Sequence, residues 1–253
     1  MLEKSLSVCV LAFNEERTVA KCLAETLAAC RTVPGDFEIV LVNDGSTDRT
    51  LEFALEFAKL NPKIRVVSNK VNAGYGGAFR RGALEARMNY CTMVGAVNAI
   101  DQNSLAEIFS HVGEKDMVLS YIANLHVRPR FRQIVSNVYR KGVNILFGYN
   151  IESFHGCNIY PTAQIRNRKY SNSHAFLVEI LIGLLDMNLS YVMVPMVLQP
   201  RLVEHSSALK IRNVIKVVYA LSRLFVLRLF RSKLVPFQKA QEKDGFTATP
   251  SRS

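Results

Sequence analysis

Apolar runs rich in β-branched residues alternate with helical patterns along the first hundred residues of the chain. The runs are LSVCVLAF, FEIVLVND, KIRVVSN and YCTMVGA, and residues 15–30, 48–60 and 76–88 between them have helical spacing. Repeated strand and helix units of this kind predict a parallel sheet with helices on both faces. Ligands of such sheets bind beyond the carboxyl ends of the strands. We therefore expect the loops FNEE, NDGSTD and GAVNAID to gather at one edge.

The pattern becomes mixed after residue 105. We expect a helix over 104–112, a strand at DMVLSYI, a basic connection HVRPRFRQ, a helix to 146, a helix over 174–186 and a strand at YVMVPMVLQ. No linker or internal repeat is visible between these segments. The sequence thus predicts an α/β domain over residues 1–207, made of a first half, 1–105, and a second half, 106–207.

The C-terminal segment predicts an amphipathic basic helix over residues 208–235. Its apolar stripe consists of Ile211, Val214, Ile215, Val218, Leu221, Phe225 and Leu229. Arg212, Lys216 and Arg223 share another face. Such a helix lies in the interface of an anionic bilayer, packs on its own domain, or pairs with a second copy of the chain. Its longest uncharged run is far below the roughly 20 residues of a membrane span, and the polar segment 236–253 is expected to be disordered.

Composition narrows the setting and the partners. The 253 residues carry 32 Lys and Arg against 21 Asp and Glu, a formal charge of +11 that favours polyanionic partners. Nucleic acid is disfavoured because the chain has no Trp and shows no interleaved aromatic and basic platform. The five cysteines are odd in number and form no CxxC pair, which predicts a reducing, cytoplasmic setting. The N-terminal apolar run is too short for a signal peptide.

The second of the three loops ends a strand on a carboxylate. Asp44 follows the apolar run, Gly45 permits a tight turn, and Ser46, Thr47 and Asp48 are suited to cap the next helix. One interpretation is a well-formed turn with a cap. The other is a ligand site, because a buried carboxylate at a strand end accepts hydrogen bonds from a base or a ribose.

The segment NAGYGGAFRRG places Gly74, Gly76 and Gly77 before a helix. Glycines at a helix start let backbone N–H groups approach a phosphate, which the helix dipole favours. A dinucleotide fingerprint would follow the first strand and be answered by an acid about 20 residues later. This segment follows the third strand instead, and Val94 to Val97 occupy the region where the acid would stand. A dehydrogenase is therefore disfavoured.

In their order and spacing, SVCVLAFNEE, EIVLVNDGSTDRT and NAGYGGAFRRG resemble the inverting family 2 glycosyltransferases with the GT-A fold. The segment from YIANLHVRPRFRQ to FHGCNIYP is similar to the acceptor side of polyprenyl-phosphate glycosyltransferases, the dolichyl-phosphate mannose synthase-like branch. The resemblance covers residues 5–210. It implies a mostly parallel central sheet flanked by helices, with a nucleotide-binding half at 1–105 and an acceptor half at 106–207.

The resemblance also implies roles for individual residues. The implied nucleotide contacts are Phe13, Asn14, Glu15, Asp44, Asn72, Gly74, Arg81, Val97 and Asn98. In the family a carboxylate in the last of these loops holds Mg²⁺ or Mn²⁺ on the leaving diphosphate, and Val97 stands at its position. Asp101 is the candidate to replace it as metal ligand and catalytic residue, although capping of the next helix is the favoured interpretation. Arginines also offset phosphate charge without a metal.

Arg128, Arg130 and Arg132 in HVRPRFRQ, together with Arg81, are the candidates for that task. A run of charge is often only a solvated face, but the matching family segment receives the acceptor phosphate. We therefore expect Arg128 or Arg132 to act in catalysis by meeting phosphate. His155 has a pKa suited to a general base, yet an ionised phosphate acceptor needs none, so a structural role is favoured. Glu179 either shapes the site or pairs with an arginine.

The sequence thus predicts transfer of a sugar from a UDP- or GDP-sugar to a polyprenyl phosphate, by an inverting mechanism, at the cytoplasmic face of a membrane. The protein would be cytoplasmic and peripheral on the anionic inner face, for glycan or cell wall biosynthesis. Two alternatives stay open. One is a catalytically impaired nucleotide-binding protein, because of Val97. The other is a glycosyltransferase with a soluble glycan acceptor.

Overall fold

The computed structural model describes residues 2–168, 170–172, 175–199, 219–226 and 228. Much of the predicted amphipathic helix at 208–235 and all of the predicted disordered segment at 236–253 lie outside the described residues. Residues 219–226 and 228 are helical, as predicted. Within the described ranges, no helix has the length and hydropathy needed to cross a membrane.

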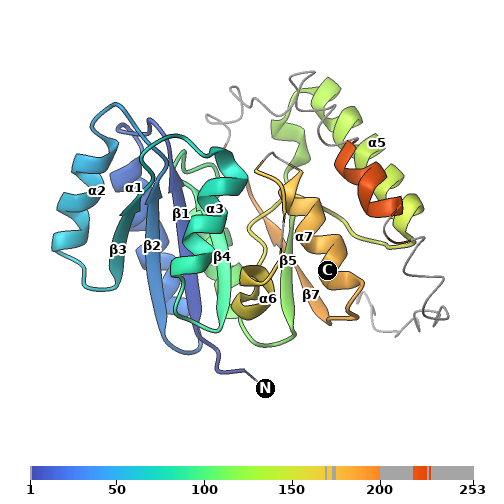
Figure 1. Ribbon diagram of the computed structural model, residues 1–253, viewed down its shortest axis with the longest axis horizontal. Coiled ribbons are helices and arrows are strands. Elements are labelled where there is room, and N and C mark those ends of the chain that lie inside the picture. Colours follow the sequence, from blue (N-terminus) through green and yellow to red (C-terminus); the bar gives the residue numbers. More distant parts are fainter. Residues whose placement is uncertain (1, 169, 173–174, 200–218, 227, 229–253) are drawn as a thin grey trace, which may run out of the picture.

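The larger of the two sheets is mostly parallel, as predicted. In spatial order its strands are β3 (Ile64–Ser68), β2 (Phe37–Asn43), β1 (Leu6–Ala12), β4 (Tyr90–Gly95) and β6 (Tyr160–Pro161). Only the short β6 is antiparallel to its neighbour. The register pairs Ala12 with Asn43 and Leu11 with Gly95, so β1, β2 and β4 end at one edge (Figure 1).

The smaller sheet contains β5 (Met117–Ile122) and β7 (Tyr191–Met196), which run parallel. An antiparallel bridge between Val118 and Ile159 connects it to the segment that leads into β6. Both strands are predicted from the sequence, but their separation from the larger sheet is not, because alternation within a strand does not name the strand's partner.

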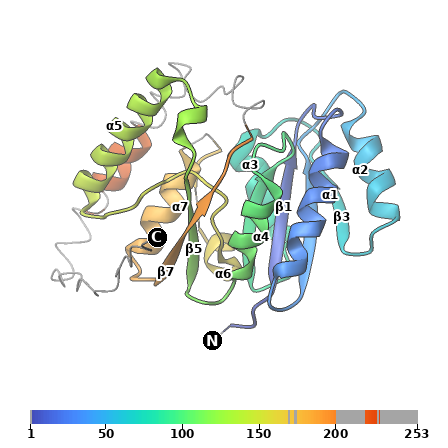
Figure 2. The same cartoon turned by 180° about the vertical axis from the view of Figure 1, so that it is seen from behind.

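Helices cover both faces of the larger sheet. The labelled helices of the chain are α1 (Val19–Ala29), α2 (Thr50–Lys59), α3 (Gly74–Glu85), α4 (Gln102–Ser110), α5 (Arg130–Phe147), α6 (Thr162–Arg166) and α7 (Phe176–Leu185), with single 3₁₀ turns at Cys30–Thr32 and Leu125–Val127. Of these, α5 lies away from the larger sheet, at the end of the molecule farthest from α2 (Figure 1). Because successive side chains of a strand point to opposite faces, Val8 and Val10 pack with α1 and α4, whereas Cys9 and Leu11 pack with α3 and α7. Figures 1 and 2 show these two layers from opposite sides.

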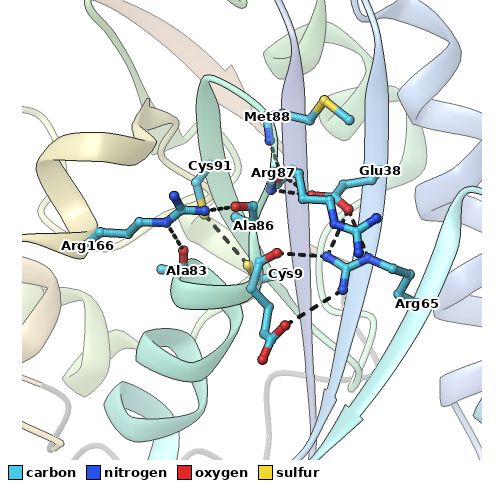
Figure 3. Close-up of polar contacts among 11 residues, drawn as sticks. Cys9, Glu38, Arg65, Ala83, Ala86, Arg87, Met88, Cys91 and Arg166 are labelled. Atoms are coloured by element: carbon cyan, nitrogen blue, oxygen red, sulfur yellow. Dashed lines mark hydrogen bonds and ion pairs between the residues drawn. The ribbon is translucent and has the colours of Figure 1, made fainter.

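A buried carboxylate closes the edge where the strands begin (Figure 3). Glu38, which is 5% exposed, accepts hydrogen bonds from Ser7 Oγ at 2.8 Å, from Arg87 N at 2.5 Å and from Arg65 Nη2 at 3.0 Å. Arg65 also donates to the carbonyl oxygen of Glu85 at the end of α3. These contacts bind β1, β2, β3 and the approach to β4 together. The edge where the strands begin is thus filled by internal contacts, and the candidate site lies at the other edge.

Candidate active site

The loops that follow β1 and β2 are held together by their own side chains. Asn14 has a left-handed φ of 55°, which asparagine tolerates, and its Oδ1 accepts a hydrogen bond from Thr47 N at 2.9 Å. In return, Ser46 Oγ accepts from Asn14 N at 3.1 Å. Phe13 lies beside these bonds with 46% of its surface exposed. The structure therefore brings Phe13 and Asn14 together with the NDGSTD loop, as predicted.

Glu15 is fixed in the same loop. Its backbone N–H donates to Thr50 Oγ1 at 2.7 Å, and its Oε2 accepts from Thr18 Oγ1 at 2.9 Å. Burial raises the pKa of Glu15, and the charge of Asp48 acts in the same direction. The side chain is half-buried at the carboxyl end of β1, where a ligand hydroxyl can reach it.

Asp44 accepts three hydrogen bonds from the loop that follows β3. Its Oδ1 accepts from Asn69 Nδ2 at 2.7 Å and from Ala73 N at 2.9 Å, and its Oδ2 accepts from Gly74 N at 3.0 Å. The residue is 3% exposed. A buried carboxylate with this many partners fixes the course of the loop 69–74. A bond from Asp44 to a base or ribose stays a prediction, and the structure adds this anchoring role.

The glycines at the start of α3 serve packing. Gly74 N is engaged with Asp44, and Gly76 N donates to the carbonyl oxygen of Asn172 at 3.2 Å. A Cβ on Gly76 would lie 2.5 Å from the carbonyl oxygen of Ser171, so only glycine lets the segment 171–172 approach this closely. Both N–H groups thus have partners within the chain, and an approach of this segment to a phosphate stays a prediction. A nucleotide contact of Gly74 through other atoms stays a prediction.

Asn72 and Arg81, both predicted nucleotide contacts, have different surroundings in the structure. Asn72 lies exposed at the site edge, and its Oδ1 accepts from Gly74 N at 3.0 Å. Arg81 instead forms an ion pair with Glu85, with 3.0 Å between Nη2 and Oε1, one turn nearer the C-terminus of α3. The structure thus gathers Asn72 with the other predicted contacts and leaves Arg81 apart from them.

The loop after β4 contains Val97 and Asn98 and lies next to a tyrosine that sequence reasoning missed. A Cβ on Gly95 would lie 3.5 Å from the Tyr75 hydroxyl and 3.6 Å from Val97 Cγ1, so these two side chains flank the end of β4. Burial raises the pKa of Tyr75 to about 12, which keeps the phenol neutral and able to donate a hydrogen bond. In the sequence, the glycines of this motif indicate a ligand loop, whereas Tyr75 between them follows no pattern that predicts a role.

Asn98 presents an unsatisfied acceptor in the same loop. The residue is 2% exposed and has a left-handed φ of 58°. Its Nδ2 donates to Glu25 Oε2 at 2.7 Å, while its Oδ1 is buried and has no hydrogen-bond partner within the described part of the chain. Buried acceptors are nearly always paired, so a donor group of a bound ligand at this loop would supply the missing hydrogen bond to Asn98 Oδ1. Its contact with Glu25 joins residues far apart in the sequence and could not be read from it.

Asp101 caps α4, so the favoured interpretation is confirmed. Its Oδ2 accepts from Asn103 N at 3.0 Å and Ser104 N at 3.2 Å. Mg²⁺ and Mn²⁺ favour carboxylate oxygens, and Val97 offers none. Across the described ranges, no three His, Cys, Asp or Glu side chains come together as a metal site. Position 97 therefore does not fit a metal site, and Asp101 as a metal ligand stays a prediction.

The end of β4 is connected to the acceptor half through residues 197–199. Gln199 N donates to the carbonyl oxygen of Ala99 at 2.9 Å. One residue earlier, Leu198 N donates to Asn124 Oδ1 and its carbonyl oxygen accepts from Asn124 Nδ2, both at 2.9 Å. Asn124 precedes the 3₁₀ turn that leads to Arg128. The basic segment therefore lies at the edge of the molecule where the nucleotide loops gather.

Arg128 and Arg132 form a positively charged site at the start of α5. The Nε of Arg128 is buried and has no hydrogen-bond partner among the described residues. Burial lowers the pKa of Arg128, and the nearby charge of Arg132 lowers it further. The first turn of α5 contains no acidic residue, and the N-terminus of a helix is itself positive. This combination is suited to an anion, and a contact of Arg128 or Arg132 with phosphate stays a prediction. The expected basic connection is partly helical.

His155 and Glu179 have local partners. His155 is exposed, and its ring centre lies 5.3 Å from that of Tyr139. Glu179 Oε2 accepts a hydrogen bond from Ser171 N at 2.6 Å and thereby fixes the segment that packs on the glycines of α3. Glu179 therefore shapes the site through Ser171.

Comparison with known proteins gives three findings. The family model for glycosyl transferase family 2 matches residues 7–171, which is more than half of the chain. A dolichyl-phosphate beta-glucosyltransferase of Trichomonas vaginalis is 39% identical over 99 residues, covering 37% of this chain and 31% of the relative. An undecaprenyl-phosphate 4-deoxy-4-formamido-L-arabinose transferase of Edwardsiella ictaluri is 36% identical over 183 residues, covering 70% of this chain and 55% of the relative. The chain thus spans about half the length, or less, of these curated relatives.

Solved structures show the same fold. Glucosyl-3-phosphoglycerate synthase from Mycobacterium tuberculosis, in complex with UDP, has a TM-score of 0.65 and 16% identity, covering 88% of this chain and 80% of that one. Mannosyl-3-phosphoglycerate synthase from Rubrobacter xylanophilus has a TM-score of 0.67 and 15% identity, covering 95% and 78%. The mycobacterial enzyme has also been crystallised with Mn²⁺, UDP-glucose and phosphoglyceric acid.

Proposed function

The chain belongs to glycosyl transferase family 2, and from that premise we propose that it moves a sugar from a UDP- or GDP-sugar to a polyprenyl phosphate. The resemblance read from the three loops is confirmed at the level of the family, and the GT-A fold is confirmed by the solved structures. The observation that carries the proposal is the positive site of Arg128 and Arg132, connected through residues 197–199 to the loops at the carboxyl ends of the strands.

The names of the relatives support this acceptor. Those with dolichyl-phosphate in their names transfer glucose, and those with undecaprenyl-phosphate transfer a modified arabinose. Dolichyl and undecaprenyl phosphates are both polyprenyl-type lipids that present one phosphate at a membrane surface. The class of acceptor, a lipid phosphate, therefore varies less among the relatives than the sugar does. We assign the class of acceptor to this chain and leave the sugar open.

The donor would bind at the carboxyl ends of β1, β2 and β4. Phe13 offers an exposed aromatic face on which a base can stack, and Glu15 offers a carboxylate to ribose hydroxyls. Tyr75 and Asn98 lie at the end of β4, where the family places the diphosphate. The neutral phenol of Tyr75 would donate a hydrogen bond to a diphosphate oxygen. UDP in the mycobacterial neighbour supports a nucleoside diphosphate in this fold.

The acceptor phosphate would sit at Arg128 and Arg132. Guanidinium groups bind phosphate through paired N–H donors. The Nε of Arg128, which has no hydrogen-bond partner among the described residues, would supply one of these donors. Binding would hold a phosphate oxygen close to the anomeric carbon of the donor sugar, and this positioning supplies much of the rate enhancement. Desolvated arginines also strengthen electrostatic attraction, because water is excluded around them.

The reaction proposed is a single displacement with inversion. A phosphate oxygen of the lipid attacks C1 of the sugar from the side opposite the nucleotide, the new C1–O bond forms, and the bond to the nucleoside diphosphate breaks. The attacking oxygen is already ionised at neutral pH, so no general base is needed. This mechanism therefore assigns no proton transfer to His155, which is exposed. The departing charge would be met by a hydrogen bond from Tyr75, which lies at the end of β4.

A second candidate function follows from Val97 alone. A family member without the usual carboxylate at this position would bind a nucleotide sugar and turn it over slowly or not at all. The closed network around Asp44 and Asn14 would then serve only recognition. A soluble glycan acceptor is the weaker alternative, because the arginine site is suited to an anion.

The location proposed is the cytoplasmic face of an anionic membrane, with the protein bound peripherally. The sequence predicts that the basic helix at 208–235, most of which lies outside the described residues, is the element that lies in the membrane interface.

Product analysis tests the proposal. The purified chain is incubated with a panel of UDP- and GDP-sugars and a short-chain polyprenyl phosphate dispersed in detergent, and lipid-linked sugar is followed by chromatography. One donor is expected to give product whose anomeric configuration, read by NMR, is opposite to that of the donor. Nucleotide binding without product from any donor would favour the second candidate.

A further inference from the structure

An apolar stripe runs along the outer side of α5. Phe131 is 71% exposed, Ile134 62%, Val138 66% and Ile145 83%. These positions are separated by three, four and seven residues, which places them on one face of an α-helix. Exposed single apolar residues are ordinary on protein surfaces, but four aligned on one helix form a continuous face that calls for a partner.

The opposite side of α5 accounts for its packing. Val143 and Phe147 are buried in the apolar cluster that also contains α7, and Tyr139 packs against it. Arg132 lies on this inner side by the same helical spacing, since it is seven residues before Tyr139. The helix therefore turns an arginine of the anion site inward and the apolar stripe outward. The inner face of α5 thus contributes to the core and the anion site, whereas its outer face is available for a partner.

Charge flanks the stripe. Arg130 and Lys141 are both exposed, and their helical positions fall together along one border of the stripe. Arg140 lies further round the helix and pairs with Glu152 at 3.0 Å. The part of α5 that points away from the domain thus combines apolar side chains with unopposed positive charge, which is the pattern of helices that lie on anionic lipid.

The helical residues 219–226 and 228 lie beside α5 in both views (Figures 1 and 2). Phe225 packs edge to face on Phe147 with ring centres 6.4 Å apart, and Arg228 donates to the carbonyl oxygen of Phe147. Tyr219 and Val226 are 71% and 48% exposed. Exposed apolar side chains of two helices are thereby concentrated at the end of the molecule farthest from α2 (Figure 1).

We propose that the stripe of Phe131, Ile134, Val138 and Ile145 docks in the interface of an anionic bilayer. An anionic membrane matches both properties of the surface, because the stripe is taken up among acyl chains while Arg130 and Lys141 meet lipid phosphates. The α5 N-terminus carries the site of Arg128 and Arg132, so docking would hold that site at the level of lipid headgroups. This inference rests on the proposed function, because the site needs to lie at the level of the headgroups only if its acceptor is a membrane lipid.

Flotation with phospholipid vesicles tests the docking surface separately from transfer. The full chain is mixed with vesicles of phosphatidylglycerol and phosphatidylcholine that contain no polyprenyl phosphate, and the partition coefficient is measured. The test variant combines Ile134→Ser, Val138→Ser and Ile145→Ser. The matched control combines Leu60→Ser and Val71→Ser, which remove apolar side chains that are 83% and 74% exposed in the nucleotide half. Circular dichroism and thermal melting establish that each variant is folded.

The stripe variant is expected to lose at least about tenfold in partition, and the control to match the wild type. Binding to vesicles of phosphatidylcholine alone should be weaker for every form, because the basic border then has no anionic partner. Equal partition of the stripe variant and the wild type would overturn the proposal. So would a wild-type dimer, seen by analytical ultracentrifugation, that the stripe substitutions dissociate while vesicle binding stays absent throughout.

A second assay separates this inference from the proposed function. With a short, water-soluble polyprenyl phosphate, the stripe variant should transfer sugar as fast as the wild type, because the site at Arg128 is intact. With the lipid acceptor in anionic vesicles it should be at least about tenfold slower. Loss in both assays would mean that the stripe supports the site itself rather than the membrane contact. Vesicle binding by a chain that transfers no sugar would leave docking standing and contradict the proposed function.

Discussion

The nucleotide half and the acceptor half meet at one edge but satisfy their polar groups in opposite ways. In the nucleotide half, Asn14, Ser46 and Thr47 bond to one another, and Asp44 accepts three hydrogen bonds from the loop that follows β3. In the acceptor half, a buried nitrogen of Arg128 has no partner among the described residues, and one whole face of α5 is apolar and exposed. The loops after β1, β2 and β3 are thus held by internal bonds, and among the residues named here only Asn98 Oδ1 of the nucleotide half lacks a partner within the described part of the chain. The acceptor half, by contrast, has a charged group and an apolar face that are suited to a partner.

This difference assigns separate tasks to the two halves. A pocket whose walls are fixed before binding recognises a small, constant ligand with little loss of conformational entropy. A desolvated cation and an exposed stripe are unfavourable for the isolated chain and become favourable only with an anion and an apolar medium. A nucleotide sugar fits the first description, and a lipid phosphate at a membrane fits the second.

Removing Asp44 should have the largest effect. Asp44→Ala leaves Asn69 Nδ2 and the N–H group of Ala73 without their acceptor and leaves Gly74 N with Asn72 Oδ1 alone. We therefore expect a loss of about 3 kcal/mol in the free energy of unfolding. Urea denaturation measures it. Asp36→Ala is the control, since Asp36 is exposed and pairs only with surface groups. A loss no larger than the control's would show that Asp44 does not hold the loop.

Arg128 should matter for transfer and not for donor binding. Arg128→Ala is expected to lower kcat/KM for a water-soluble polyprenyl phosphate by about 100-fold, because a desolvated charge-assisted contact to phosphate is lost. Affinity for UDP, measured by calorimetry, should stay within about twofold of the wild type.

Arg140→Ala controls for loss of charge on the same helix, since Arg140 pairs with the exposed Glu152. A fall in UDP affinity equal to the fall in kcat/KM would place Arg128 on the donor and remove the distinction between the two halves.

Restoring a carboxylate after β4 should change the response to metal. In Val97→Asp, affinity for UDP is expected to rise by about tenfold on adding Mn²⁺, since a carboxylate then stands beside the diphosphate position. The wild type and Val97→Ala should respond by less than about twofold. Thermal stabilisation by UDP, with and without Mn²⁺, gives the comparison. A wild-type chain that requires Mn²⁺ would mean that residues outside the described ranges, or Asp101, complete a metal site.

The smallest effect concerns the acceptor half at low pH. Hydrogen bonds from Ser190 hold the pKa of Asp116 below its ordinary value of 3.8. Since the folded-state pKa is depressed, the stabilisation is present above pH 3.8 and is lost as pH falls through the folded value. The melting temperature of the wild type should therefore exceed that of Asp116→Asn by a degree or two at pH 6, on the order of 0.5 kcal/mol or less, and the difference should shrink as the pH falls below 3.8. A difference of unchanged size below that pH would show that Asp116 acts through packing.

The sequence predicts well what depends on local pattern. The strands and their carboxyl-end loops follow from β-branched runs between helical segments, and the cap at Asp101 follows from a short acid before a helix. Pairings across the fold could not be predicted this way. Asn98 meets Glu25, and Gly76 makes room for Ser171, through contacts between residues that lie far apart in the chain.

The outward stripe of α5 shows a further limit. Its apolar positions have the spacing of an ordinary buried helix face, and the sequence predicts membrane contact only for the basic helix at 208–235. The structure shows that Val143 and Phe147 on the opposite face pack in the core and that Ile134 and Val138 are therefore exposed. A helix with two apolar faces cannot be oriented from periodicity alone.

The most direct measurement compares two acceptors that differ only in the phosphate. The wild-type chain, with its preferred nucleotide sugar, is offered a short polyprenyl phosphate and the matching polyprenol at equal concentration, and sugar transfer to each is quantified. We predict product from the phosphate and none from the alcohol, because the site of Arg128 and Arg132 is suited to an anion and a neutral alcohol offers it no charge. Equal transfer to the alcohol would contradict the assignment of the acceptor half.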